Sequence, residues 1–132
     1  MDLNQLDMAE YAAAGAVLEV RHPATDEILM GDDKKPMTIT LLGADSPAFK
    51  RAVQDIQAAN QKRKNVSPAE QERNTVNALA RATVGWSDNW TWDGQPFPYS
   101  PENCRRLYSE RPWTRTQVDE FIADRANFFV KA

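Results

Sequence analysis

His22 and Cys104 are the side chains best suited to acid–base or nucleophilic chemistry, because the chain holds one histidine and one cysteine. An imidazole can act as a general base, and a thiolate can act as a nucleophile. His22, however, stands beside Pro23 at a predicted strand end, and Cys104 shares a helical face with Leu107. These positions favour an exposed turn histidine and a small buried cysteine. We therefore predict that the protein is not an enzyme, unless scattered carboxylates converge in space.

Motifs that bind cofactors or metals are also missing from the sequence. It has no glycine-rich phosphate loop, no Gly-x-Ser-x-Gly and no His-Glu-x-x-His motif. A lone cysteine cannot close an internal disulfide, and with a single histidine it cannot build a Cys/His metal cluster. The acidic residues 88–94 lack the alternating carboxylates of a calcium loop. We expect neither a cofactor nor a metal.

The net charge of −3 conceals an uneven distribution. Residues 1–45 carry −6, residues 46–84 carry +4 and residues 85–132 carry −1. The basic run of Lys62, Arg63 and Lys64 could contact phosphates, but cations at a helix C-terminus are also favoured by the helix dipole. A domain that binds nucleic acid normally shows a basic excess, which this chain lacks. Nucleic acid is therefore not the expected partner.

Aromatic residues concentrate in the last third of the chain, which contains ten of the twelve. Large aromatics dominate both core packing and protein recognition because each removes much apolar surface from water. They can therefore either attach the last helices to the domain or bind a partner, and we expect Trp90 and Tyr99 to be exposed. Arg125 could likewise contact a ligand or pair with Glu102 or Asp119. The candidate partner-binding residues are Trp86, Trp90, Trp92, Phe97, Tyr99, Trp113 and Arg125.

The first third of the chain predicts a short helix followed by strands. Residues 2–14 favour a helix too short to be stable alone, so residues 1–14 are interpreted as an arm that is ordered only where it docks. Apolar and β-branched residues at 16–22, 28–30 and 37–42, separated by polar turns, predict a three-stranded antiparallel meander.

The remaining two thirds predict about four helices. Ser46-Pro47, Ser67-Pro68 and Ser100-Pro101 each place a capping hydroxyl before a proline at the first helical position. The first helix carries an apolar stripe that we expect to pack on the strands, and the last is predicted to begin near Thr114. The fold class is therefore α+β, an N-terminal β-meander followed by helices, with residues 15–132 as a single domain.

Several short strings occur in order across residues 16–129: Arg21-His-Pro-Ala-Thr-Asp, Thr38-Ile-Thr-Leu-Leu-Gly-Ala-Asp-Ser-Pro47, Val84-Gly-Trp86, Pro96-Phe97, Tyr99-Ser-Pro-Glu-Asn103, Leu107-Tyr108, Gln117-Val118 and Asp124-Arg-Ala-Asn-Phe-Phe129. Their order and spacing resemble a tail assembly chaperone family of long-tailed, siphovirus-like bacteriophages and prophages. Residues 1–14 and the insertion Trp90-Thr-Trp92 lie outside the pattern.

The resemblance implies a non-enzymatic role in viral morphogenesis. Such proteins coat the long helical tape measure protein, keep it soluble and help to recruit tail tube subunits, so the implied partners are both proteins and, with many copies per client, the protein itself. A structural minor tail or tail-completion protein of the virion is the main alternative, and a nucleic-acid-binding regulator is a weaker one. The chain shows no secretory signal and no apolar run near the ~20 residues of a membrane span. We expect it to act in the host bacterial cytoplasm, without a membrane partner.

Overall fold

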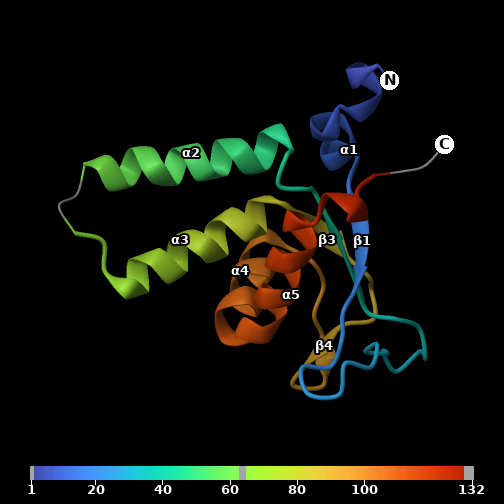
Figure 1. Cartoon of the computed structure of the whole chain (residues 1–132). Coiled ribbons are helices and arrows are strands. Elements are labelled where there is room, and N and C mark those ends of the chain that lie inside the picture. The colour runs from blue at the N-terminus through green and yellow to red at the C-terminus, as the bar shows by residue number, and fades with distance from the viewer. Residues whose placement is uncertain (1, 63–64, 130–132) are drawn as a thin grey trace.

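The computed structural model describes residues 2–62 and 65–129 and has the α+β architecture that the sequence predicts. Figure 1 shows a small sheet with helices packed against one of its faces. In chain order, the helices are α1 (Met8–Ala14), α2 (Pro47–Gln61), α3 (Pro68–Arg81), α4 (Pro101–Glu110) and α5 (Pro112–Ala123). Two 3₁₀ turns, η1 (Leu3–Leu6) and η2 (Arg125–Asn127), lie near the two ends.

The sheet is antiparallel and three-stranded, with β2 (Thr38–Leu41) between β1 (Ala16–Glu19) and β3 (Thr83–Trp86). Helix α1 precedes these strands and lies in the arm for which the sequence favoured a helix. The fold therefore does not begin with the meander, as the predicted order of an N-terminal meander followed by helices had it. The predicted segment 28–30 forms only isolated bridges, Arg21 with Ile28 and Met30 with Pro36. The third strand of the sheet is instead β3, which arrives after two helices. A second, two-stranded sheet pairs β4 (Thr91–Trp92) with β5 (Gln95–Pro96).

Three helices begin at the positions that the Ser-Pro pairs in the sequence predict. The hydroxyl oxygens of Ser46, Ser67 and Ser100 accept hydrogen bonds from backbone N–H groups three residues later, at 3.2, 3.2 and 3.0 Å. Each such cap satisfies a donor that the first helical turn leaves without an intrahelical partner. The fourth predicted helix begins at Pro112, slightly earlier than expected.

Helices α2 and α3 form an antiparallel pair that extends away from the sheet (Figure 1). The expectation that α2 packs on the strands is wrong, because α2 lies mainly against α3 and Ala52 is its one buried residue. Its apolar stripe of Phe49, Val53 and Ile56 is therefore half-buried and lines an open groove of about 460 Å³ between the two helices. Arg63 and Lys64 of the basic run lie outside the described residues.

The hydrophobic core lies between the sheet and helices α3, α4 and α5. Ile39 and Leu41 of β2 point into it and are fully buried, because alternate residues of a strand face the same side. Val76 and Leu79 of α3 meet them there, and the remaining helices contribute Cys104, Leu107, Tyr108, Val118 and Ile122.

The N-terminal helix α1 docks beside the C-terminal segment. Ala12 is 2% exposed, and its carbonyl accepts a hydrogen bond from Gly43 N–H at 3.0 Å. A Cβ on Gly43 would lie 2.8 Å from the Ala12 Cβ and 3.1 Å from the Phe128 ring, so this close approach needs glycine. The rings of Tyr11 and Phe129 also contact each other, with centroids 5.1 Å apart. The structure therefore shows the arm in its docked position.

Candidate functional site

The aromatic segment is shaped by a tight hairpin. β4 and β5 are joined by Asp93 and Gly94, both with positive φ (52° and 76°), as a type I′ turn requires. The Phe97 N–H donates to the Trp90 carbonyl at 2.9 Å and continues the pairing beyond the two strands. The hairpin thus places the Trp92 side chain next to the Phe97 ring, with a centroid distance of 5.1 Å.

Trp86 lies at the centre of the aromatic cluster. Its ring stacks on Phe97 at 5.5 Å and meets Tyr99 edge-on at 5.2 Å. Trp90 lies 5.3 Å away on another side. Both indole N–H groups have acceptors, since Trp86 Nε1 donates to the Phe97 carbonyl and Trp90 Nε1 donates to the Ser87 hydroxyl. This satisfaction of the polar edge allows the large rings to be buried.

The expectation that Trp90 is exposed is wrong, because its side chain is only 5% exposed and belongs to the core. The neighbouring residue, Asn89, holds the loop at residues 31–36 against the aromatic segment. Asn89 Nδ2 donates to Asp33 Oδ1 at 3.1 Å and to the Lys35 carbonyl at 2.9 Å. The Asn89 bond is the main cause that lowers the pKa of Asp33 below its ordinary value.

Four of the seven predicted residues come together around a pocket of about 280 Å³. We call it the aromatic pocket. In its lining, Trp90 and Phe97 are buried, and Trp92 and Trp113 are half-buried. The further lining residues are Leu29, Met37, Thr91, Asp93, Leu107, Arg111 and Thr114. Such a lining can enclose a large apolar side chain of a partner.

Two arginines stack on Trp92. The guanidinium carbon of Arg106 lies 4.2 Å from the ring centroid, and that of Arg111 lies 4.6 Å from it. Each contact is a cation–π interaction, worth about 0.5–1 kcal/mol at an exposed site. Arg106 is also paired with Glu110 at 2.7 Å, which limits the rotamers that it can adopt. The Trp92 ring is therefore held in one orientation before any partner arrives.

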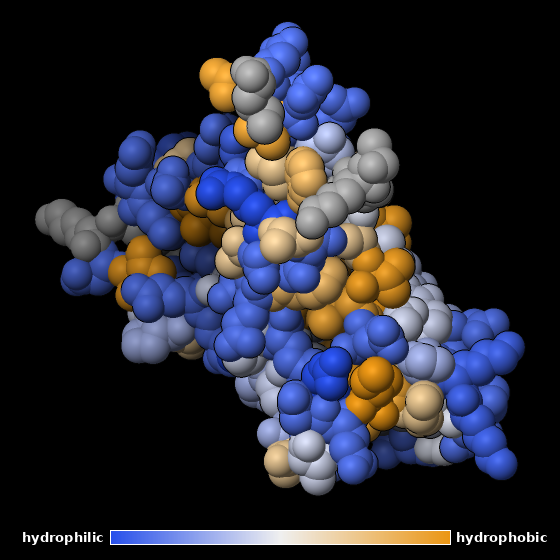
Figure 2. Space-filling model, turned by 45° about the vertical axis from the view of Figure 1, so that its right-hand side comes forward, coloured by the Kyte–Doolittle hydropathy of each residue, from blue (hydrophilic) through white to orange (hydrophobic). Residues whose placement is uncertain are grey.

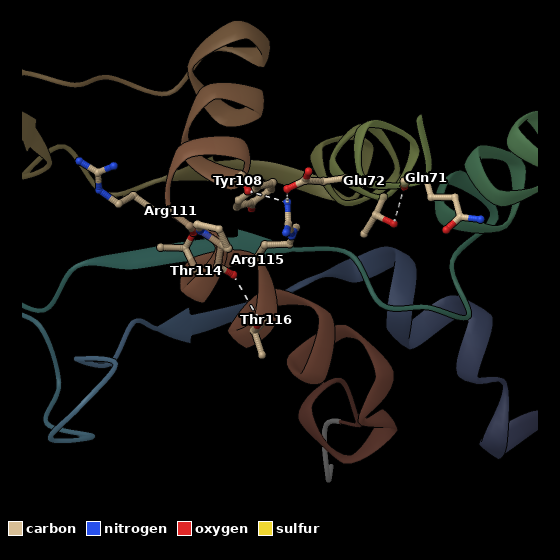
Figure 3. Close-up of polar contacts among 9 residues, drawn as sticks. Gln71, Glu72, Tyr108, Arg111, Thr114, Arg115 and Thr116 are labelled. Carbon is tan, nitrogen blue, oxygen red and sulfur yellow. Dashed lines mark hydrogen bonds and ion pairs between the residues drawn. The ribbon is translucent and has the colours of Figure 1, made fainter. Parts of the chain in front are cut away.

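Arg111 lies at the junction of α4 and α5 (Figure 3), and Trp113 follows it in the first turn of α5. Helix α5 has no side-chain N-cap, but the Thr114 hydroxyl donates to the Arg111 carbonyl at 2.7 Å. Arg115 Nη1 reaches from α5 to Glu72 on α3 and to the Tyr108 carbonyl on α4, both at 3.1 Å. These bonds connect three helices directly behind the aromatic pocket.

The other three candidate residues lie outside the aromatic pocket. Trp86 stacks on Phe97. The expectation that Tyr99 is exposed is wrong, because Tyr99 is half-buried and its hydroxyl donates to the Thr83 carbonyl at 3.0 Å. Burial is the main cause that raises the pKa of Tyr99. Arg125 pairs with Asp45, through bonds of 2.6 and 3.0 Å, and not with either carboxylate expected from the sequence.

The residues with catalytic potential occupy structural positions. His22 Nδ1 accepts hydrogen bonds from Ala24 and Thr25 N–H in a turn. Cys104 is fully buried, and burial raises the pKa of its thiol, which disfavours the reactive thiolate. Within residues 2–62 and 65–129 no group of three or more His, Cys, Asp or Glu side chains is placed to hold a metal ion.

The sequence did not indicate the two arginines that stack on Trp92 or the hydrogen bonds from Asn89 to the loop at residues 31–36. Arg106 and Arg111 are five residues apart around a helix end, and nothing in that spacing indicates a common aromatic partner. Their proximity to Trp92 depends on how α4 meets the β4–β5 hairpin.

Comparisons with protein-family models, curated proteins and solved structures give no match. No helix in the described part of the chain is long and apolar enough to cross a membrane.

Proposed function

We propose that this protein is a tail assembly chaperone of a long-tailed bacteriophage or prophage. It would bind the tape measure protein in the host cytoplasm and assist assembly of the tail tube without catalysing a reaction. The proposal starts from the ordered strings across residues 16–129 that resemble this family.

The aromatic pocket is the observation that carries the proposal. Partner-binding energy concentrates in rigid aromatic anchors with a pocket between them, and Trp92 and Trp113 supply two such anchors. The two guanidiniums that stack on Trp92 fix its ring, so little side-chain entropy is lost on binding. An apolar side chain from an amphipathic helix of the client is the ligand that suits this lining.

The groove along α2 offers a second apolar surface to the same kind of client. Its lining by Phe49, Val53, Ile56, Ala78 and Leu79 follows the length of a helix pair. A helical client could lay several side chains along such a groove, in the mode by which amphipathic helices bind helical partners. Many copies along one client would cover its apolar stripes and keep it soluble.

Co-expression with the tape measure protein of the same genome tests the proposal. We expect stoichiometric co-purification and a shift of the client from the insoluble to the soluble fraction. Trp92→Ala is expected to reduce capture about tenfold, the effect of losing one hot-spot side chain. Met30→Ala is the matched control, because Met30 is apolar and 55% exposed but does not line the aromatic pocket.

The main alternative, a minor tail or tail-completion protein of the virion, makes the opposite prediction for purified particles. A chaperone is absent from them, whereas a structural component is present at fixed stoichiometry, which quantitative mass spectrometry distinguishes. Failure to capture the client, together with presence in particles, would replace the chaperone by the structural protein. Salt-sensitive binding to DNA would instead support the nucleic-acid-binding regulator.

A further inference from the structure

Strand β1 forms one edge of the sheet and pairs on one side with β2. The carbonyl of Thr38 in β2 accepts a hydrogen bond from Ser87 on the opposite side, so Thr38 directs its backbone groups away from β1. Because backbone direction alternates along a strand, Val17 and Glu19 direct their N–H and C=O groups away from β2. Among the described residues, no hydrogen bond satisfies these four groups.

The next outward-facing residue along the same edge already has a partner. Gln117 on α5 places its side-chain amide against the backbone of Arg21. Its Oε1 accepts from Arg21 N–H at 2.9 Å, and its Nε2 donates to the Arg21 carbonyl at 2.7 Å. A side-chain amide thus makes the pair of bonds that a neighbouring strand residue would make. The edge therefore accepts strand-like partners, and Gln117 sets the limit of the free part.

A groove of about 530 Å³ runs between this edge and α5. Half-buried Leu18, Trp113 and Phe121 provide its apolar lining. Figure 2, in which the β1 side is turned forward, shows apolar residues gathered in the middle of this face with hydrophilic residues around them. An added strand on β1 would place alternate side chains over this apolar lining.

The charged residues that line this groove are mostly acidic. Among the described lining residues, Asp26, Glu120 and Asp124 carry carboxylates and Arg21 carries the one guanidinium, which donates to the Asp26 carbonyl at 3.0 Å. The surrounding third of the chain, residues 1–45, carries −6. A lysine or arginine can lay its aliphatic stem over apolar surface and place its charged head at a carboxylate. The groove therefore suits a basic side chain.

We propose that the free edge of β1 and the adjoining groove bind a short, extended, basic segment of a partner protein as an added strand. The main chain of the segment bonds to Val17 and Glu19, and its basic side chains lie over Leu18 and Phe121 toward Glu120. This mode is β-strand addition, in which backbone bonds provide affinity and alternate side chains provide specificity. The proposal does not rest on the proposed function, because its ligand is extended instead of helical and its groove shares only Trp113 with the aromatic pocket.

Synthetic peptides test the proposal by fluorescence polarisation against the full chain. The probe is Thr-Val-Lys-Val-Lys-Val-Thr, and the comparison peptides are its glutamate counterpart and a copy N-methylated on alternate residues of one edge. We expect the basic peptide to bind, the acidic one not to bind, and N-methylation to weaken binding about tenfold through lost backbone bonds. Slower hydrogen exchange at the Val17 and Glu19 amides should accompany binding.

Variants of the protein separate backbone pairing from simple charge attraction. Val17→Pro removes the outward N–H without breaking the β1–β2 ladder, and Val17→Thr is the matched control that keeps it. Glu120→Gln should weaken binding several-fold more than Glu102→Gln, which removes the same charge outside the groove. Thermal melting checks that each variant is folded.

Three results would overturn the proposal. They are no binding at millimolar peptide, equal binding of the acidic peptide, and equal binding of the N-methylated peptide. The last comparison uses the unaltered protein, so it holds even if Val17→Pro does not fold.

Discussion

Replacing Trp90 by alanine should destabilise the protein strongly. The indole is 5% exposed and lies in the core cluster, with its ring centroid 5.3 Å from that of Trp86. Deleting a buried tryptophan or phenylalanine side chain costs about 3–5 kcal/mol through lost transfer free energy and the cavity that remains. Here the cavity would join the aromatic pocket, which is open to solvent, so water can fill part of it. We therefore expect about 3 kcal/mol, the lower end of that range.

The hydrogen bond from the indole adds little to this cost. Its acceptor, the Ser87 hydroxyl, also accepts from Thr38 N–H at 3.0 Å and donates to Asn89 Oδ1 at 2.6 Å. Loss of the Trp90 donor therefore leaves no buried polar group without a partner. Deletions cost much more free energy when they do leave such a group.

Urea denaturation, followed by far-ultraviolet circular dichroism, measures the loss in the free energy of unfolding, and a thermal melt followed in the same way measures the change in Tm. A loss of about 3 kcal/mol corresponds to a fall in Tm of roughly 10–15 °C for a domain of this size. Trp92→Ala is the matched comparison, since its ring is half-buried and its main described contacts are Phe97 and two arginines. It should cost about 1–2 kcal/mol. If Trp90→Ala melted within about 2 °C of the wild type, the assignment of Trp90 to the core would be wrong.

Three further predictions concern single contacts. Gly31→Ala would place a Cβ 2.7 Å from the Asn89 Cβ, so the Asn89 side chain should shift away from its bonds to the loop at residues 31–36. We expect the free energy of unfolding, measured by urea denaturation, to fall by about 1–3 kcal/mol, and an unchanged midpoint would contradict this contact. Tyr108→Phe should cost only about 0.5–1.5 kcal/mol of stability. Thr83 Oγ1 donates to the Leu79 carbonyl and accepts from the Tyr108 hydroxyl, so the substitution removes one donor and leaves the Thr83 proton bonded. A loss above about 3 kcal/mol would refute that assignment of donors. Arg125→Gln should lower the stability of the protein at neutral pH but not in acid. The hydrogen bonds from Arg125 lower the pKa of Asp45 below its ordinary 3.8, so the pair stabilises above that value and its contribution disappears as the pH falls through the lower folded pKa. Denaturation midpoints of wild type and variant should therefore converge below about pH 3.8, and a constant difference would argue against the ion pair.

Features set by neighbouring residues could be predicted from the sequence. A capping serine acts on an N–H three residues away, so Ser46, Ser67 and Ser100 indicated their helix starts independently of the rest of the fold. Ile39 and Leu41 were identifiable because alternation along a strand determines which residues share a face. The buried Cys104 followed from its helical spacing to Leu107 in the same way.

Features set by distant residues could not be predicted. Strand β3 pairs with β2 across more than forty residues, whereas the sequence favoured a helix over about residues 68–84, which includes Thr83 and Val84 of this strand. Trp90 is buried in a core built by distant elements, and its neighbour Asn89 bonds to a loop more than fifty residues away. Arg125 lies in η2, beyond the end of α5, and its partner Asp45 is eighty residues away in the sequence. Composition showed that the aromatic residues are concentrated in the last third of the chain, but which rings face solvent depends on these tertiary contacts.

The close approach at Gly43 has a consequence for the order of folding. Ala12 and the Phe128 ring both lie against Gly43, and Tyr11 contacts Phe129. Chains are synthesised from the N-terminus, so α1 is made early but meets its complete packing surface only after more than a hundred further residues. Contacts of such large sequence separation are slow to form because a long loop must close first. The packing of α1 against the Phe128 and Phe129 segment is therefore expected to be among the last native contacts to form.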